Sequence, residues 1–393
     1  MPRVSPALAA APRTQPGPRP GHRPKGTDVI DTSPPDLARE AAPVQLLDPA
    51  GRRVEHPDWS LGLSPDEYRA LYRDMVLLRR FDAEATALQR QGELGLWASL
   101  RGQEAAQIGA GRALDLGDFV FSSYREHGIA WCRGIDPVGM LAFWRGTAHG
   151  CWDPYQAGMA NYQVVVGGHA LHGVGYAMGV QRDGADGAVL VCFGDGATSQ
   201  GDVHEAFTFA GVYGSPVVFY CQNNQWAISE PLERQTRVPL YRRALGFGFP
   251  GIRVDGNDVL ACLAVTRGAL DHARSGAGPV LIEAVTYRMA PHTTSDDAHR
   301  YRSPGEVAEW EARDPIARLR TYLDASKTAD AAFFDEVDAA ADALAVRVRA
   351  GCRAMPDPPA TVIFDHVYAG PHALVAAERE QFTAFQAQFD DAP

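Results

Sequence analysis

Three short runs in this chain are apolar at nearly every position rather than at alternate positions. They cover residues 188–193 (AVLVCF), 216–221 (PVVFYC) and 279–285 (PVLIEAV). Strands of this kind are buried on both faces, as in a parallel sheet with helices on either side. Residues 201–214, between the first two runs, have helical periodicity and a glycine stop, so 188–224 is typical of one strand–helix–strand unit. We therefore expect an α/β fold in which helices cover both faces of a parallel sheet.

The length and the start of the globular composition predict the domain organisation. A chain of 393 residues can bury a sizeable core without a metal or disulfide staple. From about residue 46 the composition becomes globular, and we expect residues 46–393 to form a single domain with flanking helices and a C-terminal extension. Residues 64–67 (SPDE) form a capping box that predicts a helix ending near Gly92. The predicted buried stripe of this helix is Tyr68, Leu71, Met75, Leu78 and Phe81.

Residues 1–45 differ from the rest of the chain because they are rich in proline and arginine. The stretch lacks a continuous apolar segment, so it is not a secretory signal. Its repeated prolines prevent the amphipathic helix of a transit peptide. We expect a disordered tail, with a basic docking arm as the alternative.

Charge, hydropathy and cysteine spacing exclude several classes of protein. No apolar run approaches the roughly 20 residues needed to cross a bilayer, so no membrane span is expected. Acidic residues outnumber basic ones by 48 to 37, which argues against a nucleic-acid partner and requires any phosphate ligand to be held locally. The six cysteines lie far apart without a Cys-x-x-Cys pair. This spacing is typical of a reduced, intracellular protein, here expected in the cytoplasm.

Polar residues follow the first two predicted strands, where open parallel sheets bind their ligands. The sequence after the first strand is Gly194-Asp195-Gly196-Ala197, and Asn224 and Trp226 follow the second. Glycines let the backbone approach a ligand, and the start of the next helix presents free amides to anionic oxygens. A carboxylate, an amide oxygen and a backbone carbonyl form half of the oxygen shell that Mg²⁺ prefers. The pattern predicts a site for magnesium and a diphosphate.

The two segments, Gly-Asp-Gly and Asn-Asn separated by nearly thirty residues, match the thiamine-diphosphate fingerprint. From about residue 46 onward the chain resembles the alpha subunit of the decarboxylating component of 2-oxo acid dehydrogenase complexes. The resemblance rests on several motifs in the order of that family: LQRQGELGLWASLRGQEAAQIGAG, FSSYREHG, GDGATSQGDVHEAFTFA, CQNNQWAIS, YRMAPHTTSDDAHRYR and FDHVYAGPHAL. It implies a thiamine-diphosphate-binding fold and oxidative decarboxylation of pyruvate or a branched-chain 2-oxo acid.

The resemblance also assigns roles to individual residues. It implies that Asp195 and Asn224 bind magnesium through their side chains and that Trp226 does so through its backbone carbonyl, where relatives usually have Tyr. The diphosphate contacts would come from Tyr124, Arg125 and Arg288, and an arginine fork suits phosphate oxygens. The remaining implied cofactor contacts are the amides of Gly196 and Ala197 and, around the aminopyrimidine ring, Val164 and Val166, mainly through their backbone.

His292 lies four residues after Arg288 in a segment similar to the active-site loop of the family. The matching His approaches the cofactor and assists transfer of the acyl group to a lipoyl group. With a reference pKa near 6.5, an imidazole can donate or accept a proton at neutral pH. Mitochondrial relatives are phosphorylated at a Ser directly after this His, whereas this chain has Thr293 there, so phosphoregulation is left open.

The resemblance further implies that this chain forms only part of an enzyme. In the family, the glutamate that activates thiamine diphosphate belongs to a separate beta subunit, and about 350 globular residues hardly accommodate a second module. We expect an α2β2 heterotetramer that acylates the lipoyl domain of a dihydrolipoyl acyltransferase. The PHTTSDD run resembles branched-chain members, whereas pyruvate and acetoin stay open as substrates.

Two other patterns offer alternative interpretations. Residues 173–179 (GVGYAMG) match a dinucleotide-binding turn, which would indicate a nicotinamide-dependent dehydrogenase. That fingerprint should follow a buried strand directly, and here residues 167–172 intervene, so close helix packing is the favoured interpretation. His169 and His172 suggest a metal pair but lack a third ligand at zinc-site spacing. Packing or hydrogen bonding is favoured for both histidines.

Overall fold

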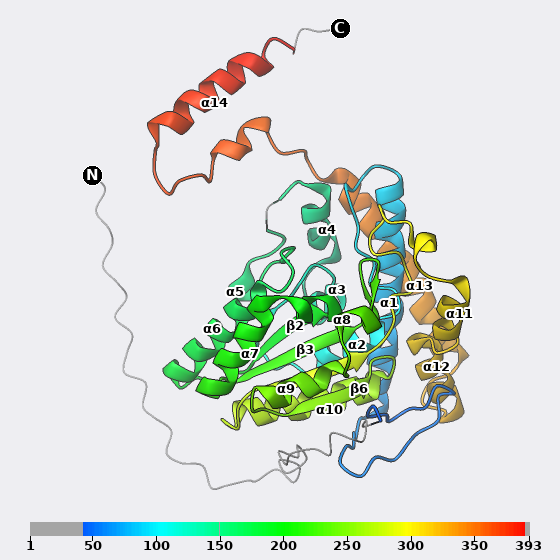
Figure 1. Cartoon of the computed structure of the whole chain (residues 1–393). Helices are drawn as coiled ribbons and strands as arrows, with labels where there is room; N and C mark the ends of the chain where they lie inside the picture. The colour runs from blue at the N-terminus through cyan, green and yellow to red at the C-terminus, as the bar shows by residue number, and fades with distance from the viewer. Residues whose placement is uncertain (1–41, 149, 390–393) are drawn as a thin grey trace, which may run out of the picture.

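The computed structural model describes residues 42–148 and 150–389, which fold around a parallel β-sheet (Figure 1). The sheet has five strands in the order β1-β2-β3-β7-β6, and every neighbouring pair is parallel. The strands are β1 (Phe119–Phe121), β2 (Val189–Gly194), β3 (Val217–Asn223), β6 (Gly251–Asp255) and β7 (Val280–Val285). The three apolar runs of the sequence form β2, β3 and β7, so the predicted α/β fold is confirmed.

Burial on both faces explains why these strands have continuous apolar sequences. In β2, Leu190 and Cys192 point into one core cluster, while Val189, Val191 and Phe193 point into the other. Successive side chains of a strand alternate between the faces, so each face needs its own apolar set. A strand exposed on one side would need only every second residue to be apolar.

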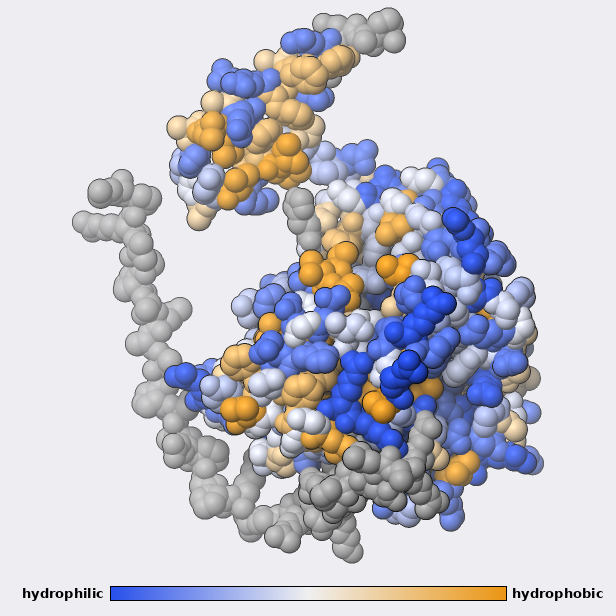
Figure 2. Space-filling view, viewed as in Figure 1, coloured by the Kyte–Doolittle hydropathy of each residue, from blue (hydrophilic) through white to orange (hydrophobic). Residues whose placement is uncertain are grey.

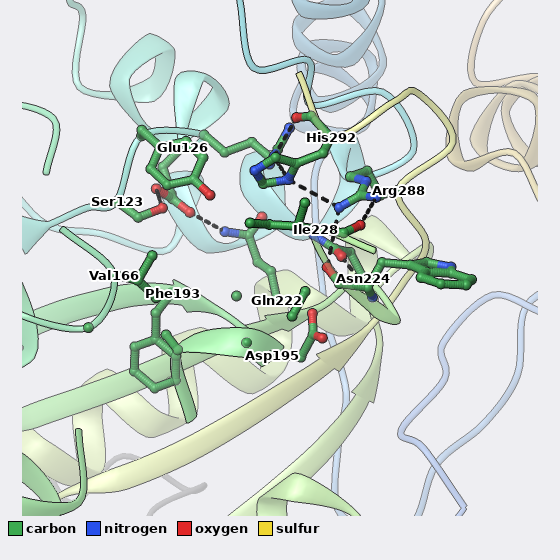
Figure 3. A pocket seen from close by; sticks show the side chains of 18 of the residues that line it. Ser123, Glu126, Val166, Phe193, Asp195, Gln222, Asn224, Ile228, Arg288 and His292 are labelled. Atoms are coloured by element: carbon green, nitrogen blue, oxygen red, sulfur yellow. Dashed lines mark hydrogen bonds between the residues drawn. The ribbon is translucent and has the colours of Figure 1, made fainter. Parts of the chain in front are cut away.

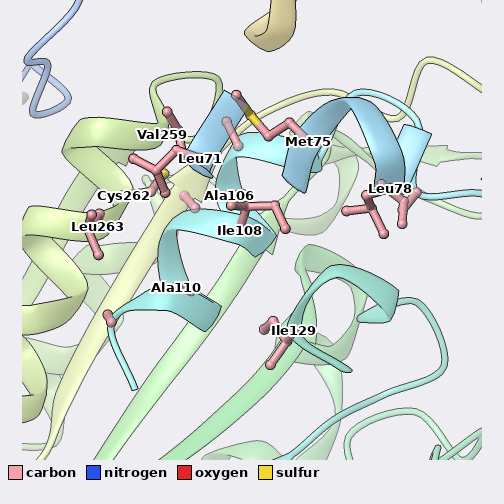
Figure 4. Close-up of a cluster of buried hydrophobic side chains, with 14 of the residues drawn as sticks. Leu71, Met75, Leu78, Ala106, Ile108, Ala110, Ile129, Val259, Cys262 and Leu263 are labelled. Atoms are coloured by element: carbon pink, nitrogen blue, oxygen red, sulfur yellow. The ribbon is translucent and has the colours of Figure 1, made fainter. Parts of the chain in front are cut away.

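The larger core packs one set of helices against the sheet (Figure 4). These helices are α1 (Pro65–Arg90), α2 (Glu104–Arg112), α3 (His127–Cys132), α4 (Pro137–Arg145), α10 (Val259–Arg274), α12 (Pro315–Ala325) and α13 (Ala331–Ala354). Helices α2 and α10 approach closely at Gly109, where a Cβ atom would lie 2.5 Å from the Cβ of Cys262. Only glycine permits this approach, which places the start of α2 over the carboxyl ends of the strands.

The second core lies on the opposite face, beneath α6 (His169–Asp183), α7 (Gly201–Tyr213) and α9 (Arg243–Gly246). The sequence of residues 173–179 lies inside α6 and not at a turn between a strand and a helix. A Cβ at Gly173 would lie 2.3 Å from Cγ2 of Val191, so this glycine lets α6 pack on β2. The nicotinamide-dependent alternative is therefore wrong, because its dinucleotide-binding turn is a packing surface.

Helix α1 begins as the capping box predicts. The Ser64 side chain accepts a hydrogen bond from the Glu67 amide, and the Glu67 carboxylate accepts one from the Ser64 amide. Four of the five stripe residues are buried, whereas Tyr68 is half-buried and packs against Tyr322 with ring centroids 5.5 Å apart. The helix ends at Arg90, close to the predicted stop.

Shorter elements complete the described part of the chain. They are α5 (Pro154–Ala157), η1 (Asp195–Ser199), β4 (Trp226–Ala227), β5 (Glu230–Pro231), α8 (Leu232–Gln235), η2 (Leu240–Arg242), η3 (Ala298–Arg300), α11 (Pro304–Glu311), η4 (Ala360–Phe364) and α14 (Ala373–Gln386). Helix α14 packs on η4 through Phe364 and Phe382, and Figure 1 shows both elements standing apart from the body of the molecule.

The described chain joins the sheet soon after it begins. Val44 forms a parallel bridge with Val254 at the β6 edge, so residues just before 46 already belong to the folded body. The tail predicted to be disordered spans residues 1–45, of which residues 1–41 lie outside the described part of the chain. No helix among the described residues has the length and hydropathy to cross a membrane. All six cysteines are free.

Candidate active site

A cavity of about 240 Å³ opens at the carboxyl ends of β2 and β3 (Figure 3). Gly194 of β2 pairs with Gln222 of β3, so the segments that follow the two strands lie side by side. The cavity brings together every predicted site residue except Val164. Those lining it are Tyr124, Arg125, Val166, Asp195, Gly196, Ala197, Asn224, Trp226, Arg288 and His292.

Asp195, Asn224 and the Trp226 backbone provide oxygen atoms in one part of this cavity. The Asp195 carboxylate is 1% exposed, and its Oδ2 accepts a hydrogen bond from Gln235 at 2.9 Å. Its Oδ1 is buried without a hydrogen-bond partner, and burial raises the pKa of the carboxyl group. An ionised carboxylate buried in this way is costly unless a cation compensates it. The oxygen set and the unpaired Oδ1 fit a hard divalent cation.

The turn that carries Trp226 has an unusual backbone. Gln225 and Ile228 have φ angles of 74° and 55°, in the left-handed region that non-glycine residues rarely adopt. For Ile228 the conformation is strained because its side chain is β-branched. The side chain of Gln225 donates hydrogen bonds to the carbonyls of Asn223 and Thr286, which hold the turn against two strands. The strained turn directs the Trp226 and Ile228 carbonyls toward Arg288.

Gly196 sits where this turn meets η1. A Cβ atom at Gly196 would lie 2.7 Å from Cβ of Ala227, so a larger residue would push the two segments apart. Gly196 and Ala197 belong to the first turn of η1, whose backbone amides have no partner within the helix. These amides are therefore available to an anionic ligand, and their contact with a diphosphate stays a prediction.

Two arginines bring positive charge into the cavity, and neither pairs directly with a carboxylate of the described residues. Arg288 is completely buried and donates to the carbonyls of Trp226 and Ile228 and to the hydroxyl of Tyr301. Burial and the neighbouring Arg125 lower the pKa of Arg288 to about 10. Within the described residues neither guanidinium forms an ion pair with a carboxylate. Two adjacent buried cations of this kind favour binding of a polyanion such as a diphosphate.

His292 lies between these two arginines. Its Nδ1 is 3.2 Å from Nη2 of Arg125 and 3.2 Å from Nη1 of Arg288. Guanidinium groups only donate, so Nδ1 accepts and the proton of the neutral ring resides on Nε2. Burial, with the charges of Arg125 and Arg288, lowers the pKa of His292 to about 3. The reference value near 6.5 is therefore wrong for the chain without a bound anion, where the imidazole is neutral at pH 7.

The cavity also contains a hydrogen-bond network that was not predicted from the sequence. Glu126 is 2% exposed, and its carboxylate accepts hydrogen bonds from Gln222 and Ser123, both at 2.8 Å. Gln107 donates to Oε1 of Gln222 and thereby fixes the orientation of this amide. Burial raises the pKa of Glu126. Glu126 directly follows the predicted Arg125 in YREHG, and this adjacency was the signal that could have identified it.

Val164 lies in a neighbouring cavity of about 520 Å³. This cavity shares Tyr124, Val166 and His292 with the first, and its other walls include Phe143 and Trp144. Val164 and Val166 are 54% and 43% exposed. Val166 thus lies where the two cavities meet, and Val164 lines only the neighbouring one.

The two histidines considered as a metal pair are separated in the structure. His169 is buried and lines the first cavity, whereas His172 is exposed on the next turn of α6. No group of three His, Cys, Asp or Glu side chains suited to a metal ion occurs within residues 42–148 and 150–389. Hydrogen bonding, the favoured interpretation, holds for His169, whose Nε2 lies 2.7 Å from the carbonyl oxygen of Cys192.

Comparison with known proteins gives a consistent result. A family model for the dehydrogenase E1 component matches residues 72–348. The 3-methyl-2-oxobutanoate dehydrogenase subunit alpha of Mycobacterium tuberculosis is 47% identical over 355 residues, which cover 90% of this chain and 97% of the relative. The pyruvate dehydrogenase E1 component subunit alpha of Staphylococcus epidermidis is 39% identical over 285 residues, covering 72% of this chain and 76% of the relative.

Proposed function

The chain belongs to the dehydrogenase E1 component family, and from this premise we propose that its cavity binds thiamine diphosphate through a magnesium ion. It is the alpha subunit of a thiamine-diphosphate-dependent 2-oxo acid dehydrogenase. The names of the relatives support this function over the acetoin dehydrogenase alternative. Bound thiamine diphosphate supplies the electron sink for decarboxylation.

One observation carries the proposal of a magnesium–diphosphate site. Asp195, whose Oδ1 is buried and unpaired, lines the same cavity as Arg125 and Arg288, whose guanidinium groups form no direct ion pair within the described residues. A divalent cation would offset the carboxylate, and a diphosphate would offset the arginines. In this proposal Asp195 and Asn224 hold the cation through side chains, Trp226 holds it through its carbonyl, and Gly196 and Ala197 donate amides to the diphosphate.

We assign His292 to handling a proton during transfer of the acyl group to a lipoyl group. The Nδ1 atom is engaged by the two arginines, which leaves Nε2–H as the free donor of the ring. An anion bound to the arginines would offset their charge and raise the pKa of His292 from its low value. The imidazole could then exchange a proton closer to neutral pH. The acceptor in this proposal is the lipoyl domain of a dihydrolipoyl acyltransferase.

Exposed apolar side chains support the proposal that this chain binds a beta subunit. Figure 2 shows hydrophobic surface on the segment of η4 and α14 that stands apart from the body. Its exposed members include Ile363, Leu374 and Phe385, which are more than half accessible. Large apolar side chains left open in this way are typical of an interaction surface. We propose an α2β2 heterotetramer in which the beta subunit supplies the activating glutamate.

The neighbouring cavity supports a branched-chain substrate. Its walls include Leu96, Phe143, Trp144 and Val164, and it reaches the first cavity at His292. An aliphatic side chain gains free energy by entering an apolar pocket, roughly 0.8 kcal/mol per buried CH₂ group. The more similar of the two relatives also has a branched-chain name, 3-methyl-2-oxobutanoate dehydrogenase.

Steady-state assays of the enzyme reconstituted with its beta subunit test this proposal. We expect a higher kcat/KM for 3-methyl-2-oxobutanoate than for pyruvate, by about 10-fold or more, because two extra methyl groups are buried. A variant that narrows the apolar cavity, Val164→Phe, should reduce the preference, whereas substitution of the exposed Leu116, outside the cavity, should leave it unchanged. A preference for pyruvate would contradict the assignment.

A further inference from the structure

Gln235, to which the sequence assigned no role, contacts the proposed magnesium ligand Asp195. Its Nε2 donates a hydrogen bond of 2.9 Å to Oδ2 of Asp195. The Oδ1 atom of the same carboxylate is buried without a hydrogen-bond partner. An ionised carboxylate only accepts hydrogen bonds, so the amide nitrogen of Gln235 must face Asp195. Gln235 therefore engages one oxygen of the carboxylate and leaves the other without a partner from the chain.

The segment that carries Gln235 also carries Trp226. Strands β4 and β5 form an antiparallel hairpin that begins at Trp226 and leads directly into α8, which ends at Gln235. The amide of Leu232, at the start of α8, donates to the carbonyl of Gln225. Nε2 of Gln235 also donates to the carbonyl of Glu230, at 3.3 Å. These backbone contacts hold the side chain in place, so its position beside Asp195 is set by the fold.

Gln235 contacts the wall of the cavity without forming part of it. Asp195 and Gly196 line the cavity, and Gln235 is not among the described residues that do. A Cβ atom at Gly196 would lie 3.8 Å from Oε1 of Gln235, which places this side chain directly against the wall. Gln235 is therefore a positioning residue, which acts on a bound cation through the orientation of Asp195.

We propose that Gln235 makes the site selective for Mg²⁺ over Ca²⁺ by holding Asp195 as a ligand through one oxygen only. The inference rests on the proposed function of the cavity. Mg²⁺ requires a nearly regular octahedron, and the two oxygens of one carboxylate lie too close together to fill adjacent corners of it. The larger Ca²⁺ accepts more ligands and binds a carboxylate through one oxygen or both. With Oδ2 engaged by Gln235, Asp195 presents the single oxygen that suits Mg²⁺.

The test measures binding of thiamine diphosphate as Mg²⁺ or Ca²⁺ is titrated into the metal-free enzyme, assembled with its beta subunit. Gln235→Met keeps the length of the side chain but removes the N–H donor. We expect the half-saturating concentration of Mg²⁺ to rise by about 10- to 100-fold, as when an outer partner of a metal ligand is lost. The concentration of Ca²⁺ should not rise, because both oxygens of Asp195 become available. The ratio of the Ca²⁺ to the Mg²⁺ concentration should therefore fall.

Two controls separate this role from a purely structural one. Arg234→Gln changes an exposed residue of the same helix and should leave both half-saturating concentrations unchanged. Thermal unfolding of each metal-free variant reports any loss of stability. A residue that only stabilises α8 would change the unfolding temperature but not the ratio of the two concentrations.

The outcomes separate this inference from the proposed function. A ratio that Gln235→Met leaves unchanged or raises, or a wild type without preference for Mg²⁺, overturns the inference and leaves the cavity assignment in place. If Gln235→Met does not fold, a crystal structure of the wild type with Mg²⁺ and thiamine diphosphate decides the question. The inference predicts Mg²⁺ on Oδ1 of Asp195 with Oδ2 still bonded to Gln235, and Mg²⁺ bound by both oxygens overturns it. Binding of thiamine diphosphate that needs no divalent cation overturns the proposed function itself.

Discussion

At the scale of single residues, the cavity concentrates charges that the chain does not neutralise. Asp195 has one neutral partner for Oδ2 and none for Oδ1, and Arg288 is completely buried among neutral acceptors. Buried charges normally occur with a partner of opposite sign. The fold holds these groups in place because β2, β3 and β7 end at the same edge of the sheet. These buried charges raise the electrostatic free energy of the protein, and we expect bound ligands of opposite charge to lower it.

Removing the charge of Asp195 should therefore weaken cofactor binding without lowering the stability of the protein. Asp195→Asn keeps the size of the side chain but loses the anionic ligand. We expect magnesium-dependent binding of thiamine diphosphate to weaken by at least about 10- to 100-fold, the range seen when only outer partners of a metal are changed. The ligand-free protein should be at least as stable as the wild type, because a desolvated carboxylate is gone. Calorimetry and thermal unfolding measure the two effects, and unchanged binding would exclude Asp195 as a magnesium ligand.

The low pKa of His292 predicts how the ligand-free chain responds to acid. The imidazole has a pKa of about 3 in the folded chain against an ordinary value of 6.5. Between these values the unfolded chain binds a proton that the folded chain does not, so the free energy of unfolding falls as the pH drops below 6.5. His292→Asn should flatten this dependence. Urea unfolding at pH 5, 6 and 7 compares the variants, and parallel curves would contradict the assigned pKa.

At the scale of elements, Gly102 couples the start of α2 to the segment that carries Arg288. Its φ is +98°, and a Cβ atom there would lie 2.2 Å from the backbone oxygen of Tyr287. Its own carbonyl accepts a hydrogen bond from Thr286. This close contact sets the position of Arg288, the residue after Tyr287. The loop before α2 thus helps to place a cavity residue from a distant part of the sequence.

Gly102→Ala should reduce both stability and diphosphate binding. The matched control is Gly92→Ala, where φ is +82° and nothing lies within 4 Å of the added Cβ. The control carries backbone strain alone, about 1 kcal/mol. Gly102→Ala adds a steric clash that costs roughly 1 to 3 kcal/mol more. Equal losses in urea unfolding, with unchanged affinity for thiamine diphosphate, would show that the contact with Tyr287 does not position Arg288.

The elements also explain which parts of the site were predictable. Asp195 and Asn224 directly follow buried strands, and adjacency in a parallel sheet brought them into one cavity. The contact between Glu126 and Gln222 joins residues 96 positions apart and has no local pattern. The low pKa of His292 arises from burial and from the charges of Arg288 and of Arg125, 167 residues away, so a reference value could not foresee it. Val164 lines only the neighbouring cavity, whereas Val166 lines both. Local motifs therefore predicted which residues lie at the carboxyl edge of the sheet. The hydrogen bonds and pKa values of the site depend on contacts between distant residues, which local motifs do not encode.

At the scale of the whole molecule, the described chain offers one half of the proposed catalytic site. The carboxylates that line the cavity are Asp195, assigned to magnesium, and Glu126, which is engaged by Gln222 and Ser123. In the proposed assembly, the activating glutamate comes from the beta subunit. Exposed apolar groups on α14, and on the outer surface of α7 at Phe209 and Tyr213, leave surface for such a partner.

The purified chain alone should consequently show no turnover of 2-oxo acids. Activity should appear when the beta subunit is added, with the mass of an α2β2 assembly in light scattering. The Asp195→Asn chain should assemble equally well and stay inactive, which controls for a partner that is active by itself. Appreciable turnover by the isolated chain would contradict a divided site.

The central claim is that oxygens from two adjacent strand ends hold a divalent cation over the arginine-lined cavity. The most direct measurement is a crystal structure of the assembled enzyme grown with thiamine diphosphate and Mn²⁺ in place of Mg²⁺. The account predicts an anomalous scattering peak within about 2.3 Å of Oδ1 of Asp195, Oδ1 of Asn224 and the carbonyl oxygen of Trp226. An ordered cofactor with no peak at these atoms, or with a peak held by other residues, would contradict it.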